Sequence, residues 1–138
     1  MRRAVSVILT IVAISLFVSL AEAKEFKLLN DESVPGARGK INVDKDKNGN
    51  YRLKVEVEHL AKPTGLTPPK QAYVVWVQTR SKEPSAIGQL RINDNLKGTL
   101  EATAPGAADQ FDVFITAEDS PNTQVPGGPR LLRATVAE

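Results

Sequence analysis

Apolar and charged side chains alternate without a break in Tyr51-Arg52-Leu53-Lys54-Val55-Glu56-Val57-Glu58. The apolar side chains fall on one face and the charged ones on the other, which is the period of a β-strand and not of a helix. The stretch therefore predicts a strand over residues 51–60, with one face buried in a core and the other face in water.

Toward the N-terminus, the segment 39–44 carries Ile41 and Val43 at the same spacing. Asn48-Gly49 lies between this segment and the strand predicted over residues 51–60. Glycine readily adopts the positive φ that a tight hairpin turn requires. The two segments are predicted to pair as an antiparallel hairpin.

Toward the C-terminus, residues 73–79 do not alternate between apolar and charged side chains, because Val74-Val75-Trp76-Val77 is a continuous apolar run. A short continuous apolar run predicts a central strand that is covered on both faces. The single tryptophan of the chain, Trp76, is predicted to be the hub of the core.

Five more short segments have the character of strands and are separated by residues that favour turns. No helical periodicity follows the first 23 residues. Together these patterns predict an all-β fold, an antiparallel β-sandwich of the immunoglobulin type with seven or eight short strands. The five segments are residues 26–29, expected as an edge strand, 86–93, 96–103, 111–118 and 131–136, with turns at 82–84, 94–95 and 105–106.

The first 23 residues have the features of a secretory signal peptide. Arg2 and Arg3 precede an uncharged run over residues 4–21, which ends in the signal-peptidase pattern Ala21-Glu22-Ala23. We predict export by the Sec route, cleavage after residue 23, and a single domain over residues 24–138 in the periplasm or outside the cell. An uncleaved anchor is the alternative, because about 18 uncharged residues approach the length of a membrane span. The remaining sequence has no apolar run long enough to insert into a membrane.

The chain after the signal peptide is nearly balanced in charge. Without Arg2, Arg3 and Glu22 it has 16 basic and 15 acidic residues, mixed along its length. This balance argues against nucleic acid as a partner, because a nucleic-acid-binding surface needs a basic patch. The sequence also has no cysteine, so it has no disulfide, thiol nucleophile or site for lipid attachment.

The only histidine, His59, is in phase with the apolar face of the strand over residues 51–60. It is predicted to lie at the end of that face, near the rim of the fold. Catalysis needs a nucleophile and an orienting acid around a histidine, and zinc-type metal sites need further nitrogen or sulfur ligands. The sequence indicates neither set, so we predict a structural role for His59, no enzymatic activity and no cofactor.

Residues 44–49 resemble the start of a calcium-binding loop. Asp44, Asp46 and Asn48 place oxygen ligands at its first, third and fifth positions, and a glycine follows at the sixth. The twelfth position, which should supply a bidentate carboxylate, is Val55. A polar hairpin turn is therefore favoured, and a calcium- or glycan-binding surface module that uses residues 44–48 is the alternative.

Two acidic pairs are candidates for a hydrolase, which would need two carboxylates on a rigid scaffold. Glu56 and Glu58 lie on the charged face of their strand, where cross-strand ion pairs account for them. Glu118 and Asp119 lie where a strand enters a long loop, a common place for functional residues. A hydrolase built on this second pair is a further alternative.

The segment from Asp119 to Arg130 is the longest stretch without periodicity. Its prolines restrict the backbone, which lowers the entropy lost on binding, and its paired glycines would allow another chain to approach closely. A plain connection between two sheets is an equal alternative. The candidate interaction residues are Glu118, Asp119, Asn122, Gln124, Gly127, Gly128 and Arg130.

Five segments follow one another in a characteristic order: Tyr73-Val74-Val75-Trp76-Val77, Gly88-Gln89-Leu90, residues 96–100, residues 111–118 and Pro126-Gly127-Gly128-Pro129. In this order they resemble the extracytoplasmic C-terminal domain of the anti-sigma-K factor family. The resemblance covers residues 51–137. It implies a β-sandwich that acts as a sensory or interaction module outside the cell.

Members of that family hold a sigma factor with a cytoplasmic helical domain, which a membrane helix joins to the outer domain. In this chain only the predicted signal peptide precedes the outer domain, so the resemblance does not extend to sigma-factor binding. Residues 119–125 also lack the Pro-Gly-Gly-Ser run that is usual in the family. We expect an exported, non-enzymatic module of the bacterial envelope that binds a protein or another envelope component, and the sequence leaves its oligomeric state open.

Overall fold

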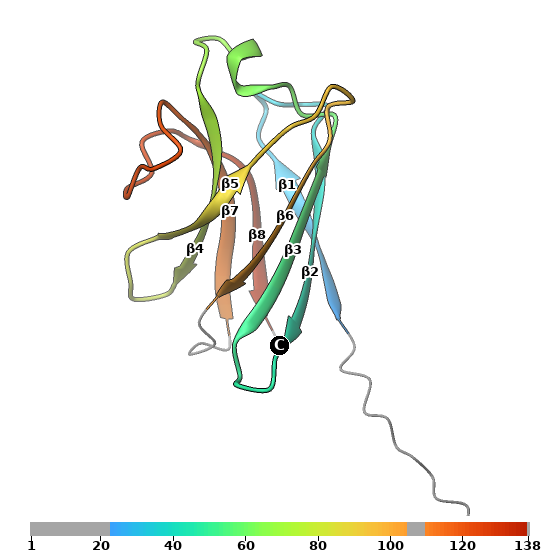
Figure 1. Ribbon diagram of the computed structural model, residues 1–138, viewed down its shortest axis with the longest axis vertical. Helices are drawn as coiled ribbons and strands as arrows, with labels where there is room; N and C mark the ends of the chain where they lie inside the picture. Colours follow the sequence, from blue (N-terminus) through green and yellow to red (C-terminus); the bar gives the residue numbers. More distant parts are fainter. Residues whose placement is uncertain (1–22, 105–109, 138) are drawn as a thin grey trace, which may run out of the picture.

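The computed structural model describes residues 23–104 and 110–137, whose arrangement is shown in Figure 1. A strand forms in each of the eight predicted segments, and all paired strands are antiparallel. The predicted signal peptide, apart from its last residue, and the predicted turn at 105–106 lie outside the described residues. The strands are β1 (Lys24–Asn30), β2 (Arg38–Lys45), β3 (Tyr51–Glu58), β4 (Ala72–Thr79), β5 (Ser85–Leu90), β6 (Gly98–Ala104), β7 (Gln110–Glu118) and β8 (Arg130–Ala137).

The eight strands belong to one sheet, in the order β5-β4-β7-β8-β1-β2-β3-β6. Its two end strands approach each other, because Ile92, just after β5, forms an antiparallel bridge with Gly98 at the start of β6. The sheet is thereby nearly closed into a barrel. The predicted all-β, antiparallel character is confirmed, but we expected two separate sheets and the structure joins the strands into one.

Strand β1 connects the two halves of this sheet. Residues 24–28 pair with β2, whereas Leu29 and Asn30 pair with β8. A strand that is paired on both sides is not an edge, so the prediction of an edge strand at residues 26–29 is wrong. Hydrophobic spacing reports the faces of a strand but not its neighbours, which is why the sequence did not indicate this position.

The hairpin of β2 and β3 has the predicted form. Ile41 lies opposite Val55, and the apolar side chains of β3 are buried while its charged side chains face outward. Strand β3 ends at Glu58, earlier than predicted, because His59 adopts a left-handed conformation with φ of 56°. The turn of the chain exposes His59 at the rim and buries Leu60 in its place.

The interior of the barrel holds the main hydrophobic core. Trp76 is also fully buried, but it belongs with Val74 and Phe114 to a second cluster, which is separate from that core. Neighbouring residues of a strand face opposite sides, so these residues lie on the outer side of β4 and β7. The prediction that β4 is covered on both faces is confirmed, whereas Trp76 is not the hub of the main core. The largest fully buried residues of the main core include Tyr73, Ile41, Leu53, Leu60, Leu90, Ile115 and Leu132.

The connections differ from the predictions at two places. A single turn of 3₁₀ helix, η1 (Pro63–Gly65), lies in the loop between β3 and β4, where the sequence shows no helical period. The turn between β5 and β6 is longer than predicted, because Leu96 has a φ of 60° and the Asn93 side chain accepts hydrogen bonds from two N–H groups of the turn. Strand β6 therefore begins at Gly98 and not at residue 96.

Candidate functional site

Glu118, the last residue of β7, is buried and holds loop 119–129 against the barrel. Its Oε1 accepts hydrogen bonds from the Thr116 hydroxyl at 2.7 Å, the Gly127 N–H at 2.8 Å and the Gly128 N–H at 3.3 Å. The Thr116 hydroxyl in turn accepts a hydrogen bond from Trp76 Nε1 at 2.8 Å. These bonds satisfy the buried polar groups between the outer cluster and the loop, as a buried polar network requires.

The paired glycines let the loop approach its own strand. A Cβ atom on Gly128 would lie 2.7 Å from the carbonyl oxygen of Ala117, and a Cβ on Gly127 would lie 3.1 Å from Glu118 Oε2. Only glycine fits this close contact at Gly128 without a shift of backbone. We predicted that these glycines would allow another chain to approach closely. In the structure the close contacts of both glycines are with β7 of the same chain.

Arg130, the first residue of β8, covers the outer cluster from the other end of the loop. Its guanidinium group lies 3.9 Å from the centroid of the Phe114 ring, and its Nη2 donates a hydrogen bond to Gln78 Oε1 at 2.7 Å. Phe114 stacks on Trp76 with 6.4 Å between the ring centroids. The face of an aromatic ring carries partial negative charge and attracts a cation. Arg130 therefore stabilises the packing beneath the loop.

The outer part of the loop faces solvent. Asn122, Gln124 and Val125 are exposed, and 70% of the surface of Val125 is accessible. Short hydrogen bonds hold this part in shape: Gln124 Nε2 donates to the Asn122 carbonyl at 3.2 Å, and the Thr123 hydroxyl donates to the Val125 carbonyl at 2.9 Å. Sequence reasoning missed Val125, although an apolar residue within a polar, proline-rich loop was a usable signal.

Glu118 and Asp119 do not act as a pair in this structure. Glu118 turns inward to the network under the loop, whereas the Asp119 side chain is 82% exposed and its Oδ1 lies 3.6 Å from Lys70 Nζ. The two carboxylates contact different partners, so their arrangement does not form the facing pair that a glycosidase requires.

A groove of about 510 Å³ lies beside loop 119–129, and His59 lines it. Loop 31–37, loop 59–71 and the adjoining ends of β7 and β8 form its walls. In Figure 1 these loops gather at the upper end of the barrel, next to η1. The Tyr73 hydroxyl ties loop 59–71 to the barrel by donating a hydrogen bond to the Ala61 carbonyl, and burial raises the pKa of Tyr73 to about 12.

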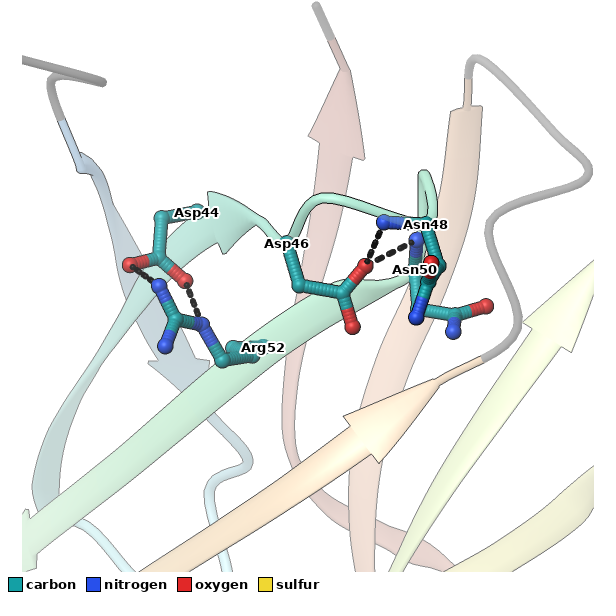
Figure 2. Close-up of polar contacts among 5 residues, drawn as sticks. All are labelled: Asp44, Asp46, Asn48, Asn50 and Arg52. Carbon is teal, nitrogen blue, oxygen red and sulfur yellow. Dashed lines mark hydrogen bonds and ion pairs between the residues drawn. The ribbon is translucent and has the colours of Figure 1, made fainter.

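Residues 44–50 lie at the opposite end of the barrel, where 46–50 form the hairpin turn between β2 and β3 (Figure 1). Asp46 Oδ1 accepts hydrogen bonds from the N–H groups of Asn48 and Asn50 at 2.8 and 2.9 Å, and Gly49 has a φ of 80°. Figure 2 shows that the Asp44 carboxylate instead faces Arg52, with two hydrogen bonds of 3.0 and 3.1 Å. The oxygen atoms therefore serve the turn and an ion pair, which supports the interpretation as a polar hairpin.

Two further properties concern only residues 23–104 and 110–137. In these ranges, no three or more histidine, cysteine, aspartate or glutamate side chains lie close enough to hold a metal ion together. The same ranges contain no helix with the length and apolarity required to cross a membrane.

Comparison with known proteins gives a relation at the level of fold. The sequence matches no known protein family and no curated protein. In structure, the chain is similar to the clock protein EA4, with a TM-score of 0.53 and 11% sequence identity over 83% of this chain and 93% of that chain. At this identity the likeness concerns the fold alone.

Proposed function

We propose that this chain is an exported, non-enzymatic binding module of the bacterial envelope, which contacts its partner through loop 119–129. The observation that carries the proposal is the clamp at Glu118, where one carboxylate oxygen accepts three hydrogen bonds. The clamp holds the base of a long loop in one conformation and leaves the outer part of the loop exposed.

Preorganisation explains why such a loop suits binding. A partner that contacts a flexible loop must order it, and this ordering costs roughly 0.5–1.5 kcal/mol for each immobilised side chain with many rotamers. Here the Glu118 clamp, the Arg130 contact and the hydrogen bonds within the loop already restrict it. Val125 offers an apolar contact, and Asn122 and Gln124 offer polar side chains around it.

The proposals of export and of an envelope location rest on the sequence, namely on the predicted signal peptide over residues 1–23 and on the resemblance to the extracytoplasmic domain of anti-sigma-K factors. The proposal of a non-enzymatic role is supported by the different partners of the Glu118 and Asp119 carboxylates and by the exposed position of His59. These observations favour a binding module over the hydrolase alternative.

The test replaces residues 122–125 with a Gly-Ser linker of equal length in the exported protein. The matched control carries the same kind of linker at residues 81–83, an exposed turn between β4 and β5 at the lower end of the barrel in Figure 1. We expect the first variant to lose capture of envelope proteins at an unchanged melting temperature, while the control retains it. Capture that survives in the first variant, with a lowered melting temperature, would show that the loop only closes the fold.

The calcium alternative has its own test. Calcium would have to displace Arg52 from Asp44 and the turn N–H groups from Asp46 before both carboxylates could turn toward one ion. We therefore expect calorimetry with calcium to give no heat of binding, and a Asp44→Asn variant to leave capture unchanged. A glycan partner is also disfavoured, because the described residues include no exposed aromatic side chain on which a sugar ring could stack.

A further inference from the structure

The groove beside loop 119–129 has the size and lining of a small-molecule site. Its volume of about 510 Å³ falls within the usual range of roughly 300–1,000 Å³ for such sites. Half-buried Leu66 and the exposed residues Pro35, Pro68 and Pro129 contribute accessible apolar surface. These residues come from three separate segments, so the fold and not one local motif builds the groove.

Among the described residues that line the groove, the charged one is the basic Lys70. His59 also lines the groove, and none of the described lining residues is acidic. The Lys70 side chain is 29% exposed, and its Nζ lies 3.6 Å from Oδ1 of the largely exposed Asp119. An exposed ion pair of this kind contributes little free energy, so a carboxylate in the groove can replace Asp119 as the partner of Lys70.

We propose that this groove binds an amphiphilic carboxylate, such as a medium-chain fatty acid, with its apolar chain on Leu66, Pro68 and Pro129 and its carboxylate at Lys70. The inference rests on the proposed function, because it specifies the class of envelope component that the module recognises. The apolar walls of the groove would hold the apolar chain of the ligand. Lys70 would bind its carboxylate, because none of the described residues that line the groove is acidic. Since Asp119 begins loop 119–129, exchange at Lys70 would also alter the loop at that end.

The test is an NMR titration of the full mature chain with sodium octanoate. Octanamide is the uncharged control of equal chain length, and sodium acetate is the control without an apolar chain. We expect octanoate to shift the backbone amide signals of residues 59–70, and to bind about fivefold or more tightly than either control, the size of one partly exposed charge pair. Lys70→Gln should abolish the preference of octanoate over octanamide, whereas Lys82→Gln, at an exposed position outside the groove, should preserve it.

Equal affinity for octanoate and octanamide would overturn the proposal, as would a preference that survives in Lys70→Gln. Signal shifts that avoid residues 59–70 would also overturn it. The linker variant at residues 122–125 separates this inference from the proposed function, because it leaves the groove residues in place. If that variant loses its envelope partner while octanoate fails to bind the unmodified chain, the proposed role of the loop is supported and the proposed carboxylate site is refuted.

Discussion

Replacement of Glu118 by alanine should unfasten loop 119–129 from the barrel. The substitution removes the acceptor of the Thr116 hydroxyl and of the Gly127 and Gly128 N–H groups. The Thr116 side chain is fully buried, so its hydroxyl group loses the hydrogen bond without gaining water, whereas exposed Gly127 can bond to solvent. The loop is therefore expected to open while the barrel stays folded.

The expected loss follows from these three donors. A buried donor left without an acceptor costs about 1–3 kcal/mol, and the two glycine N–H groups cost less because water reaches them. We expect Glu118→Ala to lower the free energy of unfolding by roughly 2–4 kcal/mol, which a domain with a stability of about 5–15 kcal/mol survives. Glu118→Gln keeps an amide oxygen as acceptor but loses the charge, so a loss of about 1 kcal/mol is expected.

Urea unfolding measures the free energy, and amide hydrogen exchange locates the change. Exchange should accelerate at Gly127 and Gly128, while amides of the β4 and β7 pairing, such as that of Ile115, stay protected. The matched control is Asp119→Asn, which removes only an exposed ion pair and should change stability by less than about 0.5 kcal/mol. If Glu118→Ala is as stable as this control and exchange at Gly127 is unchanged, the clamp does not hold the loop.

Three further predictions concern single residues. Trp76→Ala should destabilise the chain by roughly 3–5 kcal/mol, and the wild-type fluorescence should be blue-shifted; emission like that of tryptophan in water would contradict the burial of the outer cluster. His59→Gln should change the free energy of unfolding by about 1 kcal/mol or less and preserve partner capture, because His59 is exposed, whereas His59→Val should cost more, since a β-branched residue fits poorly at a φ of 56°. Because burial raises the pKa of Tyr73 from 10.0 to about 12, the folded state keeps its proton longer than the unfolded state. The Tyr73 hydroxyl therefore makes its full contribution to the free energy of unfolding below pH 10, and this contribution falls as the pH rises toward 12. Urea unfolding across this pH range should show the fall in the wild type and not in a Tyr73→Phe variant.

Strand formation could be predicted from the sequence because it depends on local pattern. The alternation over residues 51–58 places apolar side chains on one face wherever the strand lies, and the apolar run at Val74-Val75-Trp76-Val77 requires cover on both faces. The turn at Asn48-Gly49 depends on the φ that glycine allows, which is also local. Each of these features survives in the structure.

The candidate site was predictable only in outline. Sequence reasoning selected the segment from Asp119 to Arg130 because it lacks periodicity, and the structure confirms a long loop between β7 and β8. It did not indicate that Glu118 faces inward or that exposed Arg130 lies over Phe114, because these contacts form only once the loop has folded back. The residues left outward, Asn122, Gln124 and Val125, follow from that arrangement.

Tertiary structure alone decided how the strands assemble. Residue spacing shows that the side chains of Trp76 and Val75 face opposite ways, but not which way is the barrel interior. That choice depends on contacts between distant residues, such as the hydrogen bond from Trp76 to Thr116 across 40 positions, and on β1 joining β2 to β8. A local pattern is set by the geometry of one strand, whereas the order of strands and the cover of each face are set by the free energy of packing the whole chain.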